Sequence, residues 1–287
     1  MARTLEPYQL VERSIITKYR KVLWNPFIEA VKRYEMIQPG DRIAVCISGG
    51  KDSMLLAKLM QQLQKHSDFP FELVFLVMDP GYNELNRRKI ESNAALLNIP
   101  VTIFESDIFE VADSAGKSPC YLCARMRRGY LYSRAQELGC SKIALGHHFN
   151  DVVETTLISM FYGSQLQAML PKLHSTNFEG MTLIRPLYCV HEDDIIAWAR
   201  DNSLEFIQCA CRLTERSAAD TGDVNVSKRK EIKLLLRRLR QGNPNIEKSI
   251  FNSIHAVALD TIPGFKTGGV EHSFLERFNA MESTEAE

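Results

Sequence analysis

The sequence lacks any long apolar run, and none of its stretches approaches the ~18 consecutive apolar residues of a membrane-spanning helix. We therefore expect no membrane partner. The first residues, MARTLEPYQLVERS, also lack the apolar segment that a signal peptide needs. From these two absences we expect a cytoplasmic protein.

The sequence also has no net charge, because 35 lysines and arginines balance 35 aspartates and glutamates in the 287 residues. A neutral chain gives no global argument for binding nucleic acid. The charge is nevertheless uneven, since KRKEIKLLLRRLR at 228–240 is basic and the terminal MESTEAE is acidic. The basic stretch is either a solvated helix face or a local contact for the phosphates of a nucleic acid.

Cysteine is too sparse for a secreted disulfide scaffold, with seven in the whole chain. In a reducing cytosol, close spacings point instead to a metal site or to catalysis. Cys120 and Cys123 form a C-x-x-C pair, and Cys209 and Cys211 form a tighter C-x-C pair. Redox exchange, a zinc ion and an iron–sulfur cluster all use a C-x-x-C pair. The other three cysteines are expected in the core: Cys46, Cys140 and Cys189.

Short apolar runs alternate with amphipathic stretches along most of the chain. The runs predict buried strands over 42–48, 71–79, 101–107 and 141–148. Helical periodicity follows each of them, within 48–66 and over 84–98, 125–139 and 151–163. This alternation is typical of an α/β fold with a doubly wound parallel sheet. Ligands in such sheets bind at the carboxyl ends of the strands, where the motifs below fall.

The remaining segments predict additions to that core. Helices interrupted near Pro26 are expected over 10–37, a strand–helix–strand piece over 183–213 and further helices over 225–260. We therefore expect three parts: an N-terminal helical segment (1–40), an α/β domain that carries the cysteines (41–213) and a helical C-terminal region with a tail (214–287).

The hexapeptide SGGKDS, at 48–53, stands between the first predicted strand and its helix. A glycine turn lets backbone N–H groups approach an anion, the helix N-terminus adds partial positive charge, and Lys51 adds a full one. The spacing is neither G-x-x-x-x-G-K-[ST] nor G-x-G-x-x-G. A plain glycine turn with an exposed lysine and a helix cap is the alternative, but the full hexapeptide behind a buried strand indicates a phosphate-binding loop.

SGGKDS resembles the SGGxDS loop of the PP-loop ATP pyrophosphatases, which adenylate a substrate oxygen and release pyrophosphate. GHHFNDVVET, at 146–155, is similar to the GHxxDD block after the fourth strand of that family. PCYLCARMRRGYLY and IQCACRLTE resemble the cysteine blocks of its tRNA-thiolating branch. Together with the opening helix and MFYGSQLQAMLPKL, they are most similar to the tRNA 2-thiocytidine synthetase family. The resemblance runs from about residue 10 to 213.

This resemblance implies a PP-loop fold, of the adenine nucleotide alpha hydrolase-like type, and an ATP-dependent tRNA sulfurtransferase that forms AMP and diphosphate. The C2 carbonyl of a tRNA base, usually cytidine 32, would be adenylated, and sulfur would then attack the activated carbon. The implied cofactors are ATP, Mg²⁺ and a [4Fe-4S] cluster. The implied partners are tRNA and a sulfur donor, which is either sulfide or a persulfide from a cysteine desulfurase. The family likeness also suggests a homodimer.

The resemblance also assigns roles to residues of the nucleotide site. Lys51, Asp52 and Asp151 are expected to be catalytic: Lys51 and Mg²⁺ offset phosphate charge, and the aspartates hold the metal or orient the base. In Asn150-Asp151 an asparagine replaces the first acid of the family pair. The expected nucleotide-binding residues lie in the two loops and at the end of the second strand: Ser48, Gly49, Gly50, Lys51, Asp52, Ser53, Met78, Gly146 and His147.

The implied cluster ligands are Cys120, Cys123 and Cys211, with Cys209 as the alternative third ligand. Cys120 and Cys123 also complete the expected catalytic set. Zinc needs four ligands and C-x-C is awkward for one ion, whereas a cluster can bind through three cysteines. The arginines that follow the pair either contact RNA phosphates or compensate the charge of the cluster: Arg125, Arg127 and Arg128.

Two other functions use the same loop or the same cysteines. An ATP-dependent ligase, forming lysidine or an amide, needs the PP-loop but no set of three cysteines. A regulator that senses ATP would use the PP-loop, and one that senses an iron–sulfur cluster would use the cysteines. Neither would carry out thiolation. The tRNA position is a further alternative, because the C-terminal region lies outside the resemblance and another nucleotide is a possible target.

Overall fold

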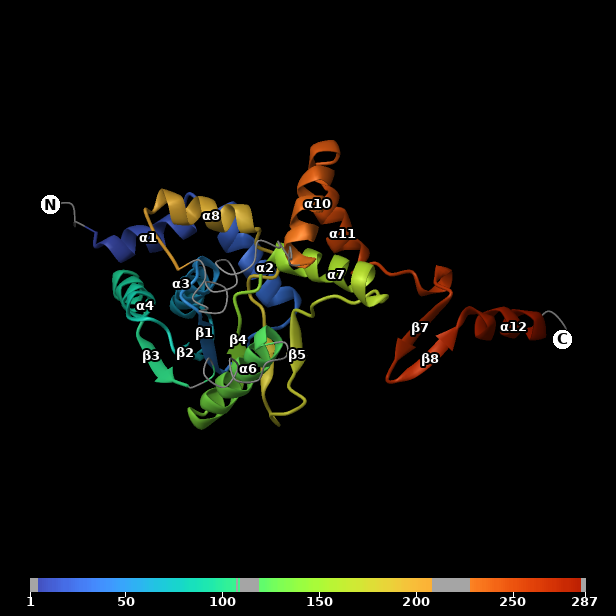
Figure 1. Ribbon diagram of the computed structural model, residues 1–287, viewed down its shortest axis with the longest axis horizontal. Helices are drawn as coiled ribbons and strands as arrows, with labels where there is room; N and C mark the ends of the chain where they lie inside the picture. Colours follow the sequence, from blue (N-terminus) through green and yellow to red (C-terminus); the bar gives the residue numbers. More distant parts are fainter. Residues whose placement is uncertain (1–4, 107, 109–118, 208–227, 285–287) are drawn as a thin grey trace. The chain divides into compact units, whose positions relative to one another are not determined.

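The computed structural model describes residues 5–106, 108, 119–207 and 228–284, with only the course of the helix over 119–125 and 281–284. The chain forms two compact units, Met1–Lys233 and Leu234–Glu287. The first unit holds a six-stranded sheet with helices on both faces (Figure 1). Within the described ranges, no helix has the length and apolar character needed to cross a membrane.

Five parallel strands and one antiparallel edge strand make the sheet, in the order β3-β2-β1-β4-β6-β5. The parallel strands are β1 (Arg42–Ile47), β2 (Glu72–Asp79), β3 (Val101–Glu105), β4 (Lys142–Ala144) and β6 (Thr182–Ile184). The edge strand β5 (Lys172–His174) pairs antiparallel with β6. The predicted doubly wound α/β fold is confirmed, although β5 was not predicted and β4 ends four residues earlier than expected.

β1 lies at the point where the winding of the sheet reverses. Its neighbours are β2 on one side and β4 on the other, and β3 lies beyond β2. From β1 the chain adds β2 and β3 on one side of the sheet. It then crosses back over the sheet and adds β4 on the other side of β1. In sheets of this kind the crevice at the carboxyl ends of the two strands at the reversal is the usual ligand site. SGGKDS follows β1, and GHHFND follows β4, so both motifs lie at that crevice.

The alternation of side chains along β1 explains the two helical layers. Ala44 and Cys46 pack into one apolar cluster with Tyr132 and Ala135 of α6 (Pro119–Glu137). The intervening residues of β1 point to the opposite face because successive strand residues alternate. On that face α3 (Lys51–His66) packs against β1 and β2, and α8 (Glu192–Asp201) packs against α3. The core is therefore divided between the two faces of the sheet.

The N-terminal helices belong to the first unit. They are α1 (Pro7–Ile16), a π-helical segment η1 (Arg20–Trp24) and α2 (Asn25–Arg33), which begins beside Pro26 as the sequence predicted. The ammonium of buried Lys58 in α3 donates to Glu12 Oε1 of α1 at 2.8 Å. The helices α4 (Glu84–Leu96) and α7 (Phe149–Gly163) also belong to this unit.

The C-terminal elements follow the sheet in the chain. α10 (Lys228–Gly242) begins in the first unit, and α11 (Ile246–Ser253), a 3-10 turn η2 (Leu259–Thr261) and α12 (Phe274–Thr284) belong to the second. The predicted helices over 225–260 are confirmed by α10 and α11, whereas the hairpin of β7 (Gly264–Thr267) and β8 (Val270–Ser273) was not predicted. Gly268 and Gly269 have positive φ in its two-residue turn, as tight hairpins require.

Candidate active site

The loop after β1 is held in shape by glycine and by Ser53. Gly49 has φ +84°, and a Cβ there would lie 2.6 Å from Ile90 Cγ1 and 2.7 Å from Ile207 Cδ1, so only glycine fits. Ser53 Oγ accepts a hydrogen bond from Ser48 N at 3.2 Å and donates to Gly50 O at 2.9 Å. These bonds close the loop over the N-terminus of α3, where free backbone N–H groups and the helix dipole favour an anion.

The loop after β4 packs directly on the first turn of α3. A Cβ on Gly146 would lie 3.1 Å from Ser53 N and 3.2 Å from the carbonyl carbon of Asp52, both backbone atoms. A side chain at this position would push the two loops apart. Gly146 therefore brings the motifs after β1 and β4 together, as the sequence predicted from the geometry of a parallel sheet.

Two aspartates lie on either side of His148. His148 and Asp151 form a reciprocal cap at the start of α7: His148 Nδ1 accepts from Asp151 N at 3.4 Å, and Asp151 Oδ2 accepts from His148 N at 3.1 Å. His148 Nε2 lies 3.9 Å from Asp52 Oδ1 and 3.5 Å from Asp151 Oδ2. The sequence-predicted pair, Asp52 and Asp151, is thus brought together around one buried imidazole.

Lys51 lies between two carboxylates, and one of them was not predicted. Its ammonium is 3.2 Å from Asp52 and 3.1 Å from Glu192 Oε1, at the start of α8. Burial alone would lower the pKa of Lys51, but Asp52 and Glu192 outweigh it and raise the pKa. Burial would raise the pKa of Glu192, but Lys51, His148 and Lys233 lower it to about 2. Lys51 and Glu192 are therefore an ion pair at neutral pH.

The start of α10 supplies two further cations to the same group. Arg229 Nη1 lies 2.7 Å from Asp151 Oδ1, and Lys233 Nζ lies 3.1 Å from Glu192 Oε2. Glu154 of α7 lies 3.6 Å from both cations. Burial raises the pKa of Glu154 to about 7, although both cations oppose the shift. The basic stretch was predicted as a solvated or RNA-binding face, and these two residues instead contact carboxylates.

Asn150 and His147 have different surroundings. The side-chain oxygen of buried Asn150 accepts from the backbone N–H of Glu192 at 2.9 Å, so this residue links the starts of α7 and α8. His147, a predicted nucleotide contact, has a buried Nδ1 that makes no hydrogen bond. Burial and the charge of Arg185 lower the pKa of His147 to about 4, so its imidazole is neutral near pH 7.

Met78, an expected nucleotide-binding residue at the end of β2, directs its side chain into the core. It packs with Ile108 in a small apolar cluster that Tyr82, Met126 and Leu131 border. Only the backbone of β2 at this position is thus available to a ligand. Asp79, the next residue, closes the turn after β2 by accepting from Gly81 N and Tyr82 N at 2.9 and 2.7 Å.

The cysteine pair lies in the first turns of a helix. α6 begins at Pro119, six residues earlier than predicted, so Cys120 and Cys123 are three positions apart on one helix. Cys209 and Cys211 lie outside the described residues, so the choice of third ligand stays a prediction. The other three cysteines are free thiols that are buried or half-buried: Cys46, Cys140 and Cys189.

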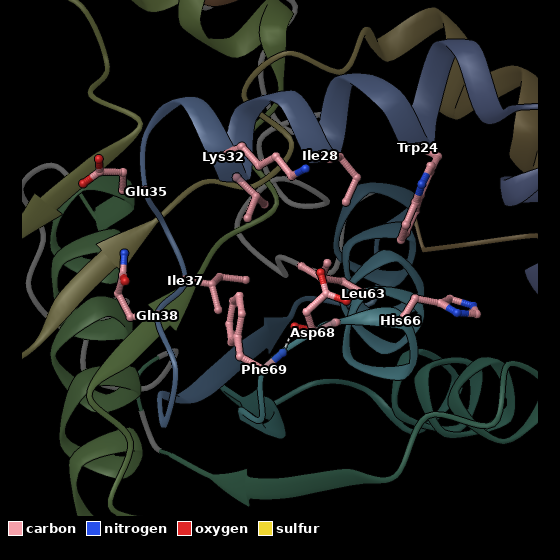
Figure 2. Close-up of a pocket in the computed structure, with 12 residues that line it drawn as sticks. Trp24, Ile28, Lys32, Glu35, Ile37, Gln38, Leu63, His66, Asp68 and Phe69 are labelled. Carbon is pink, nitrogen blue, oxygen red and sulfur yellow. Dashed lines mark hydrogen bonds between the residues drawn. The ribbon is translucent and has the colours of Figure 1, made fainter.

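One cavity of about 430 Å³ lies away from these loops (Figure 2). Trp24 of η1 and Ile28 of α2 line it together with Leu63 and His66 from the end of α3 and with the segment before β2. That segment leads into the amino end of β2, whereas the two glycine loops follow the carboxyl ends of their strands. The cavity is therefore no part of the candidate active site.

Two comparisons with known proteins assign the sequence to a family. The family profile described as the PP-loop domain matches residues 17–214. The tRNA-cytidine(32) 2-sulfurtransferase of Geobacter sulfurreducens is 37% identical over 240 residues, which cover 83% of this chain and 90% of that protein. The protein of the same name from Neisseria meningitidis serogroup C is 42% identical over 198 residues, covering 67% and 61%. The chain therefore belongs to the PP-loop family and, within it, to the tRNA-cytidine(32) 2-sulfurtransferase family.

A solved structure supports the fold independently. The U34-tRNA thiolase NcsA from Methanococcus maripaludis, determined with its [4Fe-4S] cluster, superposes with a TM-score of 0.63. The two chains are 19% identical, and the match covers 85% of this chain and 80% of that one. At this level of identity the likeness shows the fold alone.

Proposed function

We propose that this protein is an ATP-dependent tRNA sulfurtransferase that replaces the C2 oxygen of cytidine 32 with sulfur. The observation that carries this function is the close packing of the SGGKDS loop on the Gly146 loop at the reversal of the sheet. In a member of the tRNA-cytidine(32) 2-sulfurtransferase family, that packing forms a site for ATP.

The residues at the site fit ATP and Mg²⁺. Gly49 and Gly146 leave room where a Cβ would collide, so backbone can approach phosphate oxygens closely. Lys51 Nζ contacts Asp52, yet the buried Oδ1 of that carboxylate accepts no hydrogen bond. Mg²⁺ is commonly bound by one or two carboxylates together with substrate phosphates, and Asp52 and Asp151 would serve in that way. Bound Mg²⁺ would neutralise charge that develops on the phosphates.

The chain's own groups then have defined roles in adenylation. The C2 oxygen of the base attacks the α-phosphorus, the bond to the bridging oxygen breaks, and pyrophosphate leaves. The backbone N–H groups of the loop and Lys51 hold the phosphates and stabilise the departing charge. The C2 oxygen is a poor leaving group by itself, and the same oxygen leaves readily as part of AMP when sulfur attacks C2.

Cys120 and Cys123 would hold a [4Fe-4S] cluster together with Cys211 or Cys209. The pair is three positions apart on α6, a spacing that suits two ligands of a single cluster. A cluster bound by three cysteines keeps one iron open for an exogenous sulfide. Arginines just after the pair, Arg127 and Arg128, lie where they would compensate the negative charge of such a group.

We further propose cytoplasmic tRNA as the substrate, a homodimeric protein, and sulfide or a cysteine desulfurase persulfide as the sulfur donor. The family membership supports a tRNA substrate. An ATP-dependent ligase is disfavoured because relatives of more than a third identity over most of their length carry the sulfurtransferase name. A tRNA position other than 32 is the second candidate, and nucleoside analysis separates the two.

Thiolation of tRNA in a deletion strain tests the function directly. Nucleosides from tRNA of the deletion strain should lack 2-thiocytidine by mass spectrometry, and the wild-type gene should restore it. Cys123→Ala should fail to restore the nucleoside while the purified variant still binds ATP. Lys51→Ala should fail because phosphate binding is weakened. Unchanged 2-thiocytidine in the deletion strain would contradict the function, and restoration by Lys51→Ala would contradict the adenylation step.

A further inference from the structure

The charged groups at the site form a continuous series that crosses from the PP-loop to α10. Lys51 contacts Glu192, Glu192 contacts Lys233, and Lys233 lies near Glu154. Arg229 then joins Glu154 to Asp151 at distances of 3.6 and 2.7 Å. Residues from four helices thus alternate in charge around the place where phosphate is expected. Two of the cations, Arg229 and Lys233, lie beyond residue 214, where the match to the PP-loop domain ends.

Without the two cations of α10, the charges in this series would disfavour the binding of a polyanion. Four carboxylates take part, namely those of Asp52, Asp151, Glu154 and Glu192. Lys51, Arg229 and Lys233 lie within 4 Å of them, as does the ring of His148. If the two α10 cations were absent, Lys51 and the ring of His148 would be the basic groups left among these contacts. A triphosphate would then be repelled by the carboxylates around it.

The exposures of these groups place the α10 cations on the solvent side of the carboxylates. The side chains of Arg229 and Lys233 are 44% and 36% exposed, whereas those of Asp151 and Glu154 are 17% and 3% exposed. A ligand that enters from solvent therefore meets the cations before the carboxylates beneath them. Arg229 also reaches Thr155 Oγ1 at 3.4 Å, so its guanidinium is held at α7 by more than one contact.

We propose that Arg229 and Lys233 are nucleotide-binding residues that supply the positive charge this acidic site needs to accept the triphosphate of ATP. The inference rests on the proposed ATP-dependent function and adds a phosphate-binding pair from outside the matched domain. Asp151 and Glu192 position the two cations in the absence of nucleotide. The phosphates of ATP then compete with these carboxylates for the guanidinium and the ammonium.

Nucleotides with different numbers of phosphates provide the test. Binding of adenosine, AMP, ADP and a non-hydrolysable ATP analogue with Mg²⁺ is measured by calorimetry for the full chain. Removing one cation at a distance of several ångströms should weaken binding of the ATP analogue by about tenfold. Arg229→Gln and Lys233→Gln should each show that loss, and the double variant a larger one. Adenosine affinity should stay within about twofold, because adenosine carries no charge.

Arg229 and Lys233 could affect nucleotide binding through their charge or, in a docking role, by holding the start of α10 in place. Matched variants separate these two roles. Arg229→Lys and Lys233→Arg keep the charge and should retain most of the affinity for the ATP analogue. Arg238→Gln removes an exposed charge from the same helix and should leave the affinity unchanged. A docking role would lower the affinity for adenosine and for the ATP analogue alike. Equal losses for both ligands, or affinity for the analogue within twofold of wild type in the double variant, would overturn the proposal.

A measurement on the unaltered protein covers the case in which a variant does not fold. Phenylglyoxal modifies exposed arginines, and peptide mass spectrometry reports modification at Arg229 and at Arg238. The Mg²⁺ complex of the ATP analogue should protect Arg229 and leave Arg238 reactive. Equal modification of Arg229 with and without the analogue would count against the proposal. Wild-type protein that binds no ATP analogue at all would instead contradict the proposed function itself.

Discussion

Glu154 shows at the scale of one residue how the site perturbs an ordinary carboxyl. Its side chain is 3% exposed, one oxygen has no hydrogen bond, and burial raises its pKa to about 7. In the unfolded chain the carboxyl has its usual pKa near 4.5, so folding takes up a proton between about pH 4.5 and 7. The contribution of Glu154 to stability is thus fully present below pH 4.5 and is lost as the pH rises through 7.

Glu154→Gln should remove this dependence. Between pH 5 and 8 the free energy of unfolding of wild type should fall relative to that of the variant, because glutamine does not ionise. Urea unfolding at several pH values measures the difference. Exposed Glu179→Gln serves as the control and should follow wild type. A constant difference between wild type and Glu154→Gln across that range would show that the carboxyl has an ordinary pKa.

The residues that sequence reasoning missed have partners far away in the chain. Glu192 reads from the sequence as one of three acids at the start of an amphipathic helix, a common arrangement at a helix N-terminus. Its contact with Lys51 spans 141 positions, and that of Arg229 with Asp151 spans 78. No local period or motif encodes such pairs. The glycines, in contrast, were found because a loop of fixed conformation leaves a local pattern.

At the scale of the elements, the contact between the Gly146 loop and α3 fixes the width of the site. Gly146→Ala should force that loop away, because the atoms that a Cβ meets belong to the backbone of Asp52 and Ser53 and cannot rotate aside. We expect the free energy of unfolding to fall by about 1–3 kcal/mol, as for other overpacked positions. Affinity for the ATP analogue should fall as well. Chemical denaturation and calorimetry measure the two effects.

The control for this substitution is Gly129→Ala in α6. A Cβ on Gly129 meets nothing within 4 Å, and its φ is not positive. Alanine should therefore stabilise the helix by roughly 0.5–1 kcal/mol. If Gly146→Ala also proved neutral or stabilising, the two loops would not be as closely packed as the structure indicates.

Elements were predictable from sequence where they are long or strongly apolar. β1 and β2 are buried along most of their length, and α3 carries an apolar face over sixteen residues. The pattern of apolar residues in the sequence is therefore clear for each of them. Strands were predicted near β4 and β6 but without their bounds, and β5 was missed, because three residues are too few for a periodic signal. Pairing with neighbouring strands defines them, and that information lies outside the segment itself. The early start of α6 was missed because the helix was predicted to begin after the cysteine pair.

At the scale of the whole molecule, zero net charge constrains how the protein meets tRNA. Attraction must come from local basic groups, since 35 positive residues balance 35 negative ones. On α10, Arg237 and Arg238 are exposed, unlike Lys233. We expect tRNA affinity to fall steeply with salt, and Arg237→Gln with Arg238→Gln should lower the salt slope by about one unit per arginine.

Binding isotherms at several salt concentrations test this expectation. The double variant should bind tRNA more weakly at low salt and should keep wild-type affinity for the ATP analogue. Arg229→Gln and Lys233→Gln should have the opposite selectivity, with a loss confined to the nucleotide. A salt slope equal to that of wild type in the arginine double variant would show that the exposed face of α10 does not contact tRNA.

The approach of Ile207 to Gly49 joins the nucleotide loop to two distant parts of the chain. Ile207 lies so close to Gly49 that no side chain fits between them, and Ile90 of α4 comes equally close. The same glycine that leaves room for phosphate therefore also lets two isoleucines pack against the loop. A bulkier residue at position 49 would push these side chains away, so affinity for the ATP analogue and the free energy of unfolding would fall together.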